Sequence, residues 1–170
     1  MSELNIAGIV EESIVDGPGV RFVIFVQGCP HACPGCHNPD THSFDGGYKI
    51  STDELYRKIH ENPLVKGVTF SGGEPFCQAD ALAELGARLQ NEGYNLFVYS
   101  GYTLSTLLQM ADTKIGVKQL LSVCNYLVDG PFLEKERDLT LKFRGSKNQK
   151  IYDITCFPNS KRIYEAEEFL

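Results

Sequence analysis

The stretch Val20-Arg-Phe-Val-Ile-Phe-Val26 is followed, one residue later, by Gly28-Cys-Pro-His-Ala-Cys-Pro-Gly-Cys-His-Asn38. The first part is an apolar run broken by a single arginine, which predicts a buried strand. The second part is a short loop, stiffened by glycine and proline, with three cysteines: Cys29, Cys33 and Cys36. Three thiolates on one loop can converge on a metal centre and leave one coordination position open. An open position is where metal chemistry takes place.

The cysteine loop alone admits four interpretations. The first is an iron–sulfur cluster held by three cysteines, with a small molecule on the remaining iron. The second is a structural zinc site with His31, His37 or His42 as fourth ligand, although we expect His31 and His42 to face solvent. The third is a covalent c-type haem, because Cys33-Pro-Gly-Cys-His37 matches that attachment pattern. The fourth is a redox pair formed by Cys33 and Cys36, which leaves Cys29 without a role.

The bulk composition is that of an ordinary globular protein. The chain has 170 residues, of which 42% are hydrophobic and 22% charged, so we expect a single domain over residues 1–170. A net charge of −6 disfavours non-specific nucleic-acid binding. The sequence shows neither a signal peptide nor a membrane-length apolar stretch, so no membrane contact and a cytoplasmic location are expected. Six cysteines in that setting favour metal ligation or reduced thiols over disulfides.

Apolar periodicity alternates strands and helices along the chain. Since strands separated by helices pair in parallel, and a complete eight-unit barrel needs about 250 residues, we expect an incomplete, open parallel βα barrel of four to six βα units. The loops at the carboxyl ends of its strands would meet at one rim. Strands are predicted at 20–26, 65–71, 94–100, 126–128 and 150–154, and helices at 51–60, 79–89, 103–110 and 117–123.

Several motifs resemble those of one enzyme superfamily. The spacing of the three cysteines after a first strand resembles the radical S-adenosylmethionine superfamily. Ser71-Gly-Gly-Glu-Pro75, after the next strand, is similar to its Gly-Gly-Glu-Pro motif. Asp16-Gly-Pro-Gly-Val-Arg21 resembles a segment of the activases of glycyl-radical enzymes. Val128–Phe132 and Phe143–Gln149 resemble late segments of the activases of anaerobic ribonucleoside-triphosphate reductase. The sequence departs from the common pattern at two positions. Many members have an aromatic residue where this chain has Gly35, and relatives often have tyrosine where it has His37.

The resemblance implies a mechanism and its cofactors. Cys29, Cys33 and Cys36 would hold a 4Fe-4S cluster whose fourth iron binds S-adenosylmethionine, with no side chain acting as acid or base. Reductive cleavage of S-adenosylmethionine would generate a glycyl radical on anaerobic ribonucleoside-triphosphate reductase, with electrons from a low-potential donor. Activation of another glycyl-radical enzyme, such as pyruvate formate-lyase, is the alternative. From a different class, a structural zinc protein or a ferredoxin-like electron carrier also stays open.

The resemblance also implies which residues contact cofactor and partner. Glu74 and Ser100 have equally simple structural explanations, since an acid can cap the following helix and a serine can close a turn. Cofactor contacts are expected at Gly35, Cys36, His37, Gly72, Gly73, Glu74 and Ser100. Partner contacts are expected at Asp16, Arg21, Arg144 and Asn148.

Overall fold

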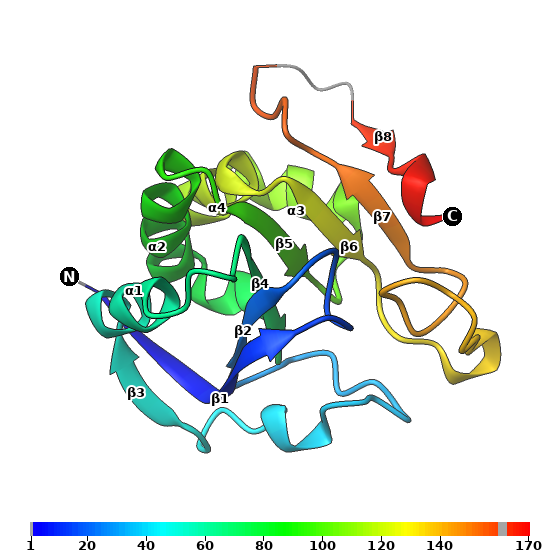
Figure 1. Ribbon diagram of the computed structural model, residues 1–170. Coiled ribbons are helices and arrows are strands. Elements are labelled where there is room, and N and C mark those ends of the chain that lie inside the picture. The colour runs from blue at the N-terminus through cyan, green and yellow to red at the C-terminus, as the bar shows by residue number, and fades with distance from the viewer. Residues whose placement is uncertain (1, 160–162) are drawn as a thin grey trace.

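The computed structural model describes residues 2–159 and 163–170 and contains an eight-stranded sheet of order β3-β1-β2-β4-β5-β6-β7-β8 (Figure 1). Its centre consists of four parallel strands, all predicted from their apolar runs. The core of the α/β prediction is therefore confirmed. The four strands are β2 (Arg21–Val26), β4 (Gly67–Gly72), β5 (Asn95–Tyr99) and β6 (Tyr126–Asp129).

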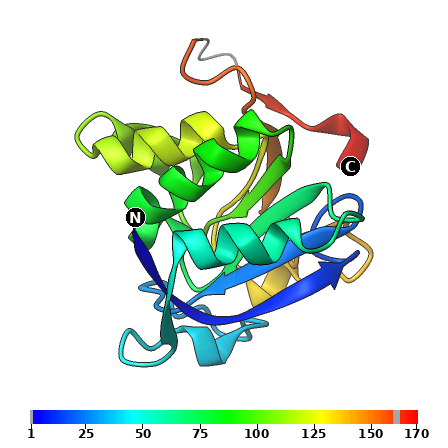
Figure 2. The ribbon, with the colours of Figure 1, turned by 60° about the vertical axis from the view of Figure 1, so that its left-hand side comes forward.

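All four α-helices in the described residues lie on one face of the sheet (Figures 1 and 2). The parallel strands follow one another in a single direction, so right-handed crossovers place every connecting helix on the same side. Side-chain caps begin two of them as predicted: Ser51 Oγ accepts from Glu54 N over 3.1 Å, and Thr103 Oγ1 from Thr106 N over 3.2 Å. The helices are α1 (Thr52–His60), α2 (Ala79–Asn91), α3 (Leu104–Ala111) and α4 (Ile115–Val123).

The two faces of the sheet carry different side chains because successive residues of a strand point to opposite sides. Towards the helices, the strands bury aliphatic and aromatic residues in the main core, among them Ile24, Phe70 and Val98. The other face carries more polar side chains, such as Arg21 and Thr69. That second face is the one on which a pocket forms.

Both edges of the sheet are antiparallel, so the expectation of a purely parallel sheet is wrong there. β1 (Glu3–Ser13) pairs antiparallel with β2 and with β3 (Tyr48–Ser51). β7 (Lys150–Asp153) pairs antiparallel with β6 and with β8 (Tyr164–Glu165). The physical reason is clear for β1, since the seven residues 14–20 are too few for the crossover that a parallel pair requires.

The carboxyl-terminal segment covers part of the face opposite the helices. Phe169, in the short 3₁₀ helix η4 (Glu167–Phe169), packs with Phe97 and Phe143 at ring-centroid distances of 6.3 and 5.5 Å. Within the described residues, no helix is long and apolar enough to cross a membrane. The other 3₁₀ helices are η1 (Pro39–Thr41), η2 (Pro75–Gln78) and η3 (Glu134–Glu136).

Candidate iron–sulfur and cofactor site

The cysteine loop leaves the carboxyl end of β2 and is fixed by backbone hydrogen bonds. Gly28 N donates to Thr41 O over 2.7 Å, and Cys29 N donates to His42 O over 3.0 Å. Within the loop, Cys36 N donates to a carbonyl three residues earlier over 3.1 Å, which closes a turn. The main chain thus positions the loop, while all three thiols remain free of disulfide bonds.

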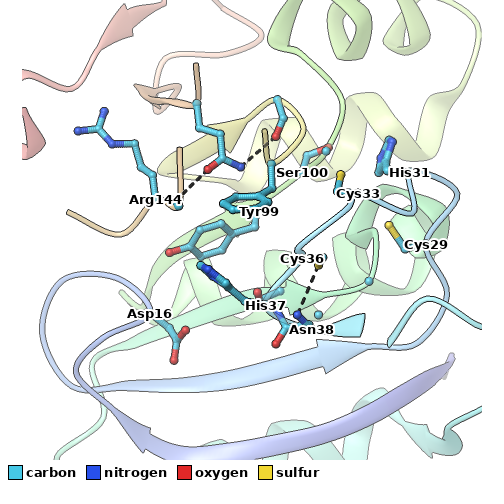
Figure 3. A pocket seen from close by; sticks show the side chains of 18 of the residues that line it. Asp16, Cys29, His31, Cys33, Cys36, His37, Asn38, Tyr99, Ser100 and Arg144 are labelled. Carbon is cyan, nitrogen blue, oxygen red and sulfur yellow. Dashed lines mark hydrogen bonds between the residues drawn. The ribbon is translucent and has the colours of Figure 1, made fainter. Parts of the chain in front are cut away.

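The three thiols line one pocket of about 420 Å³. It is formed by the loops that follow β2, β4, β5 and β6, so the predicted meeting of these loops at one rim is confirmed. Figure 3 shows Cys29 and Cys33 on one side of this pocket and Asp16 and Arg144 on the other. Besides the cysteines, the predicted site residues that line it are Asp16, His37, Gly72, Gly73, Ser100 and Arg144.

The surroundings of two of the thiols bear on metal binding. Burial raises the pKa of the half-buried Cys29 thiol, an effect that backbone hydrogen bonds oppose and the nearby Glu74 carboxylate reinforces. A thiolate there needs positive charge, which a bound metal supplies. Cys36 Sγ accepts a hydrogen bond from Asn38 N over 3.4 Å, and hydrogen bonds to sulfur tune the potential of iron–sulfur clusters.

The three thiols belong to one pocket, but they are not gathered into a compact site for a single ion. In residues 2–159 and 163–170, no group of three His, Cys, Asp or Glu side chains lies close enough together to hold one metal ion. A zinc ion would require thiolates at about 2.3 Å from a common centre. A cluster of several irons and sulfides is wider and reaches thiols spread along a pocket wall. Three thiols of one loop, Cys29, Cys33 and Cys36, are the candidate donors for a cluster held at three corners.

Gly72 and Gly73 join the end of β4 to the cysteine loop. Gly72 has φ +92°, and a Cβ on Gly73 would lie 2.2 Å from Gly28 O. Gly73 N donates to Val26 O, and Glu74 N donates to Gly28 O, both over 2.8 Å. The glycines are thus required for close main-chain packing, in addition to forming part of the pocket wall.

Glu74 is fully buried behind the pocket wall rather than in it. One carboxylate oxygen accepts from Ser100 Oγ over 2.9 Å and Gly101 N over 2.8 Å, and the other accepts from Phe76 N over 3.0 Å. The structural explanation of Glu74 as a cap, here of η2, is therefore confirmed. Its predicted contact with a cofactor ammonium group stays a prediction, as does that of Ser100, which does line the pocket.

His31 also reaches this carboxylate, so the expectation that it faces solvent is wrong. Its Nε2 lies 2.7 Å from Glu74 Oε1, and only 16% of its side chain is exposed. His37, by contrast, is exposed at the pocket and lies 5.2 Å from the Phe132 ring, centroid to centroid. Gly35 does not line the pocket; a Cβ there would meet the Glu134 side chain at 3.2 Å.

Arg21 supports the sheet beneath the pocket. It is 2% exposed, and its guanidinium donates to Thr69 Oγ1, Pro18 O and Asn95 O over 2.8 Å each. Burial lowers its pKa to about 10, so it keeps its charge at neutral pH. The predicted contact between Arg21 and a partner is therefore wrong, because no part of the guanidinium is free to reach one. Asp16, which does line the pocket, accepts from Ser13 Oγ over 2.6 Å.

Arg144 and Asn148, the other two residues predicted to contact a partner, also differ in whether they line the pocket. Arg144 lines the pocket and donates from Nη2 to Phe169 O over 3.0 Å. Asn148 does not line it; its amide donates to Pro131 O over 2.7 Å and so shapes the loop after β6. Asn148 thus has a structural hydrogen bond, and its contact with a partner stays a prediction.

Sequence reasoning missed aromatic residues of the pocket. Tyr99 lines it, and its hydroxyl donates to Phe143 O over 2.6 Å. Burial raises the pKa of the Tyr99 hydroxyl, so it remains a hydrogen-bond donor. The alternation along β5 was the available signal, because Leu96 and Val98 face the helices and Tyr99 must then face the other side.

Comparison with known proteins gives consistent matches. A family model described as "4Fe-4S single cluster domain" matches residues 15–152. The anaerobic ribonucleoside-triphosphate reductase-activating protein of Escherichia coli (strain K12) is 32% identical over 83% of this chain and 93% of its own length. The protein of the same name from Pasteurella multocida (strain Pm70) is 33% identical over 91% of this chain and 100% of its own length.

More distant matches cover less of the chain. The pyruvate formate-lyase-activating enzyme of Clostridium pasteurianum is 41% identical, but over 48% of this chain and 36% of that enzyme. The solved structure of QueE from Escherichia coli aligns with 59% of this chain and 54% of its own, at 21% identity and a TM-score of 0.47, which is too partial a likeness to carry weight. On its full-length matches, the chain belongs to the 4Fe-4S single cluster domain family and, within it, to the anaerobic ribonucleoside-triphosphate reductase-activating proteins.

Proposed function

We propose that this protein activates an anaerobic ribonucleoside-triphosphate reductase by generating a glycyl radical on it. The observation that carries the proposal is that three thiols of one loop share a pocket with the ends of β4 and β5, in a chain whose full-length relatives are named for that activation. The electron would come from a low-potential donor. No nucleic acid or membrane takes part in this function, and we place it in the cytoplasm.

The pocket has the parts that the two cofactors require. Cys29, Cys33 and Cys36 would hold the cluster, whose fourth iron is left for S-adenosylmethionine. When bound, the cluster would supply the electron for reductive cleavage of S-adenosylmethionine to methionine and a 5′-deoxyadenosyl radical, and this radical would take a hydrogen atom from the partner's glycine. The protein itself contributes binding and orientation rather than acid–base chemistry.

The pocket wall divides the cofactor contacts between main chain and side chains. Gly72 and Gly73 form the wall where the methionine part would lie, and Ser100 lies next to them at the end of β5. His37, with the main chain of Cys36, would lie along the adenine. Gly35 precedes these two residues in the chain and would act through the turn that it allows at φ +74°.

The far side of the pocket is the natural entrance for the partner. Asp16 and Arg144 lie opposite the cysteines in Figure 3, one acidic and one basic. An extended glycine-containing segment offers both N–H and C=O groups, which a carboxylate and a guanidinium can bind. We therefore keep these two as the partner-contacting residues.

We also propose that the fold is an open βα barrel in one domain. The four parallel strands are joined by three helical crossovers on one face, a singly wound arrangement as in barrels. The pocket lies at the carboxyl ends of these strands, where barrel sites are found. The family match from residue 15 to residue 152 spans most of the same sheet.

Activation of pyruvate formate-lyase is the second candidate. It is favoured by the 41% identity to a pyruvate formate-lyase-activating enzyme over part of the chain. A competition experiment separates the two. The reduced protein with its cluster is incubated anaerobically with S-adenosylmethionine and either purified partner, and the glycyl radical is quantified by electron paramagnetic resonance. We expect a radical on the ribonucleotide reductase alone; a radical only on the lyase reverses the assignment.

A further inference from the structure

His31 lies between the first two cysteines of the loop, and its side chain turns inward. Its Nε2 is 2.7 Å from Glu74 Oε1, a carboxylate with no exposed surface. An ionised carboxylate oxygen only accepts, so His31 Nε2 is the donor when it faces the ionised Glu74. The bond joins two residues that are 43 positions apart in the chain, one in the cysteine loop and the other after β4.

The same carboxylate also binds the end of β5. Ser100 Oγ and Gly101 N donate to the oxygen that His31 contacts, over 2.9 and 2.8 Å. Three loops, each following a different parallel strand, therefore meet at a single buried side chain. These are the loops that carry the thiols on one side and the predicted S-adenosylmethionine contacts on the other.

Packing holds the imidazole in place. Its ring lies edge-on to Tyr102, with centroids 4.5 Å apart and an interplanar angle of 80°. A Cβ on Gly101 would lie 2.3 Å from His31 Cδ2, so only glycine leaves room for the ring at this point. A solvent-exposed loop histidine would not be packed this closely against Tyr102 and Gly101.

We propose that His31 is a positioning residue, which fixes the cysteine loop to the ends of β4 and β5 through Glu74 and so holds the thiols in place relative to the predicted S-adenosylmethionine contacts. The inference rests on the function proposed above. His31 lines the pocket together with the thiols, but in this role its imidazole acts through Glu74. All three cysteines remain when His31 is replaced, so we expect the cluster still to assemble.

The first test needs no cofactor. Amide hydrogen exchange of residues 29–36 and 101 is compared in iron-free wild-type protein, His31→Leu and His31→Gln. Leucine removes the donor, whereas the glutamine amide can still donate to Glu74. We expect exchange on the order of tenfold faster in His31→Leu, with recovery in His31→Gln. His60→Leu is the matched control, because it removes another histidine–glutamate pair, between α1 and the end of α2, whose residues do not line the pocket.

The second test uses protein with the cluster assembled. We expect wild-type iron content in His31→Leu, binding of S-adenosylmethionine weakened on the order of tenfold, and a smaller change in the resonance spectrum of the reduced cluster when S-adenosylmethionine is added. His31→Gln should recover both signals. Gly101→Ala, which displaces the imidazole sterically, should reproduce the defect without removing any donor.

Each failure has its own signature. Unchanged amide exchange in His31→Leu overturns the inference while wild-type activity is intact. Faster exchange with wild-type affinity and spectrum reduces His31 to a loop contact and also overturns it. If wild-type protein with its cluster neither binds nor cleaves S-adenosylmethionine, the proposed function fails first, and the positioning role falls with it.

Discussion

At the scale of single residues, the proposed chemistry depends on three thiols, those of Cys29, Cys33 and Cys36, whose surroundings differ. Cys36 Sγ accepts a hydrogen bond from Asn38 N, whereas Cys29 is half-buried near the Glu74 carboxylate, and burial raises its pKa even though it receives backbone hydrogen bonds. The protonated thiol is therefore favoured over the thiolate at Cys29 until iron supplies the compensating positive charge. The open coordination position depends on the absence of a fourth such thiol, and in the described residues Cys77, Cys124 and Cys156 lie outside the pocket lining.

Replacing any ligand cysteine should prevent cluster assembly. Cys29→Ala, Cys33→Ala and Cys36→Ala each leave two thiolates, too few to hold a four-iron cluster at three corners. After anaerobic reconstitution with iron and sulfide, we expect the broad visible absorbance to be lost in each variant. The exposed Cys156 provides the control, since Cys156→Ala should retain full absorbance. A ligand variant with wild-type iron content would contradict the assignment.

Arg21 should matter for stability rather than for partner binding. Arg21→Met removes the buried guanidinium and leaves its acceptors, among them Thr69 Oγ1 and Asn95 O, without their donor. We expect the free energy of unfolding to fall by about 3 kcal/mol in urea titrations. Arg137→Met, at an exposed position, should change it by about 0.5 kcal/mol or less. Unaltered stability of Arg21→Met together with weakened partner binding would restore the surface role.

At the scale of elements, the site depends on how strand ends pack against one another. β2 and β4 are parallel neighbours, and their carboxyl ends continue into the cysteine loop and into Gly73 and Glu74. The contact is main chain against main chain, which side chains cannot replace. Any change at this contact should therefore affect both the metal loop and the cofactor wall.

Gly73→Ala tests this packing. The new Cβ would lie 2.2 Å from Gly28 O, next to Cys29, so the cysteine loop must move. We expect lower iron incorporation and a loss of stability on the order of 2 kcal/mol. In Gly8→Ala the added Cβ meets nothing within 4 Å, and this variant should behave as wild type. Normal iron content in Gly73→Ala would mean that the glycine serves the cofactor alone.

The pairing of α1 with the end of α2 should make stability depend on pH. Burial by itself lowers the pKa of His60, but its hydrogen bonds to Tyr56 O and Glu92 outweigh that and raise it above 6.5. Hydrogen bonds from Tyr56 and His60 lower the pKa of Glu92 below 4.5. The His60 contribution is complete below pH 6.5 and lost as pH rises through the folded-state pKa. The Glu92 contribution is complete above pH 4.5 and lost on acidification.

The pair should therefore stabilise the fold most between these two values. We expect His60→Leu to destabilise the protein at about pH 5.5, and the difference from wild type to shrink at about pH 8.5. Urea unfolding of wild type and His60→Leu at these two pH values measures the difference in the free energy of unfolding. A difference that is the same at both, or larger at the alkaline one, would show that His60 is not charged in the pair.

Elements differ in how far the sequence predicts them. The four parallel strands and the caps of α1 and α3 follow from local patterns, namely apolar runs and serine or threonine at the helix start. β1 does not, since Glu3–Ser13 has charged ends and an interior glycine, and only its pairing with β2 makes it a strand. The contact between His31 and Glu74 links residues 43 apart, which no local pattern reveals.

At the scale of the whole molecule, the hydrophobic core and the pocket lie on opposite faces of the sheet. Helices and the main core occupy one face, and the pocket occupies the other, at the carboxyl ends of the parallel strands (Figures 1 and 3). The carboxyl-terminal Phe169 seals the neighbouring part of that face and holds Arg144 through its carbonyl oxygen. Changes in the pocket can therefore alter binding while the core keeps the molecule folded.

The central claim is that one iron is coordinated by S-adenosylmethionine and by no side chain of the protein. Pulsed resonance measurements on the reduced cluster, with S-adenosylmethionine carrying ¹⁵N at the amino group, test it directly. We predict a hyperfine coupling from the labelled nitrogen that appears only when the labelled compound is bound. No coupling at saturating concentration, with a protein nitrogen or a fourth cysteine sulfur bound to that iron instead, would contradict the account.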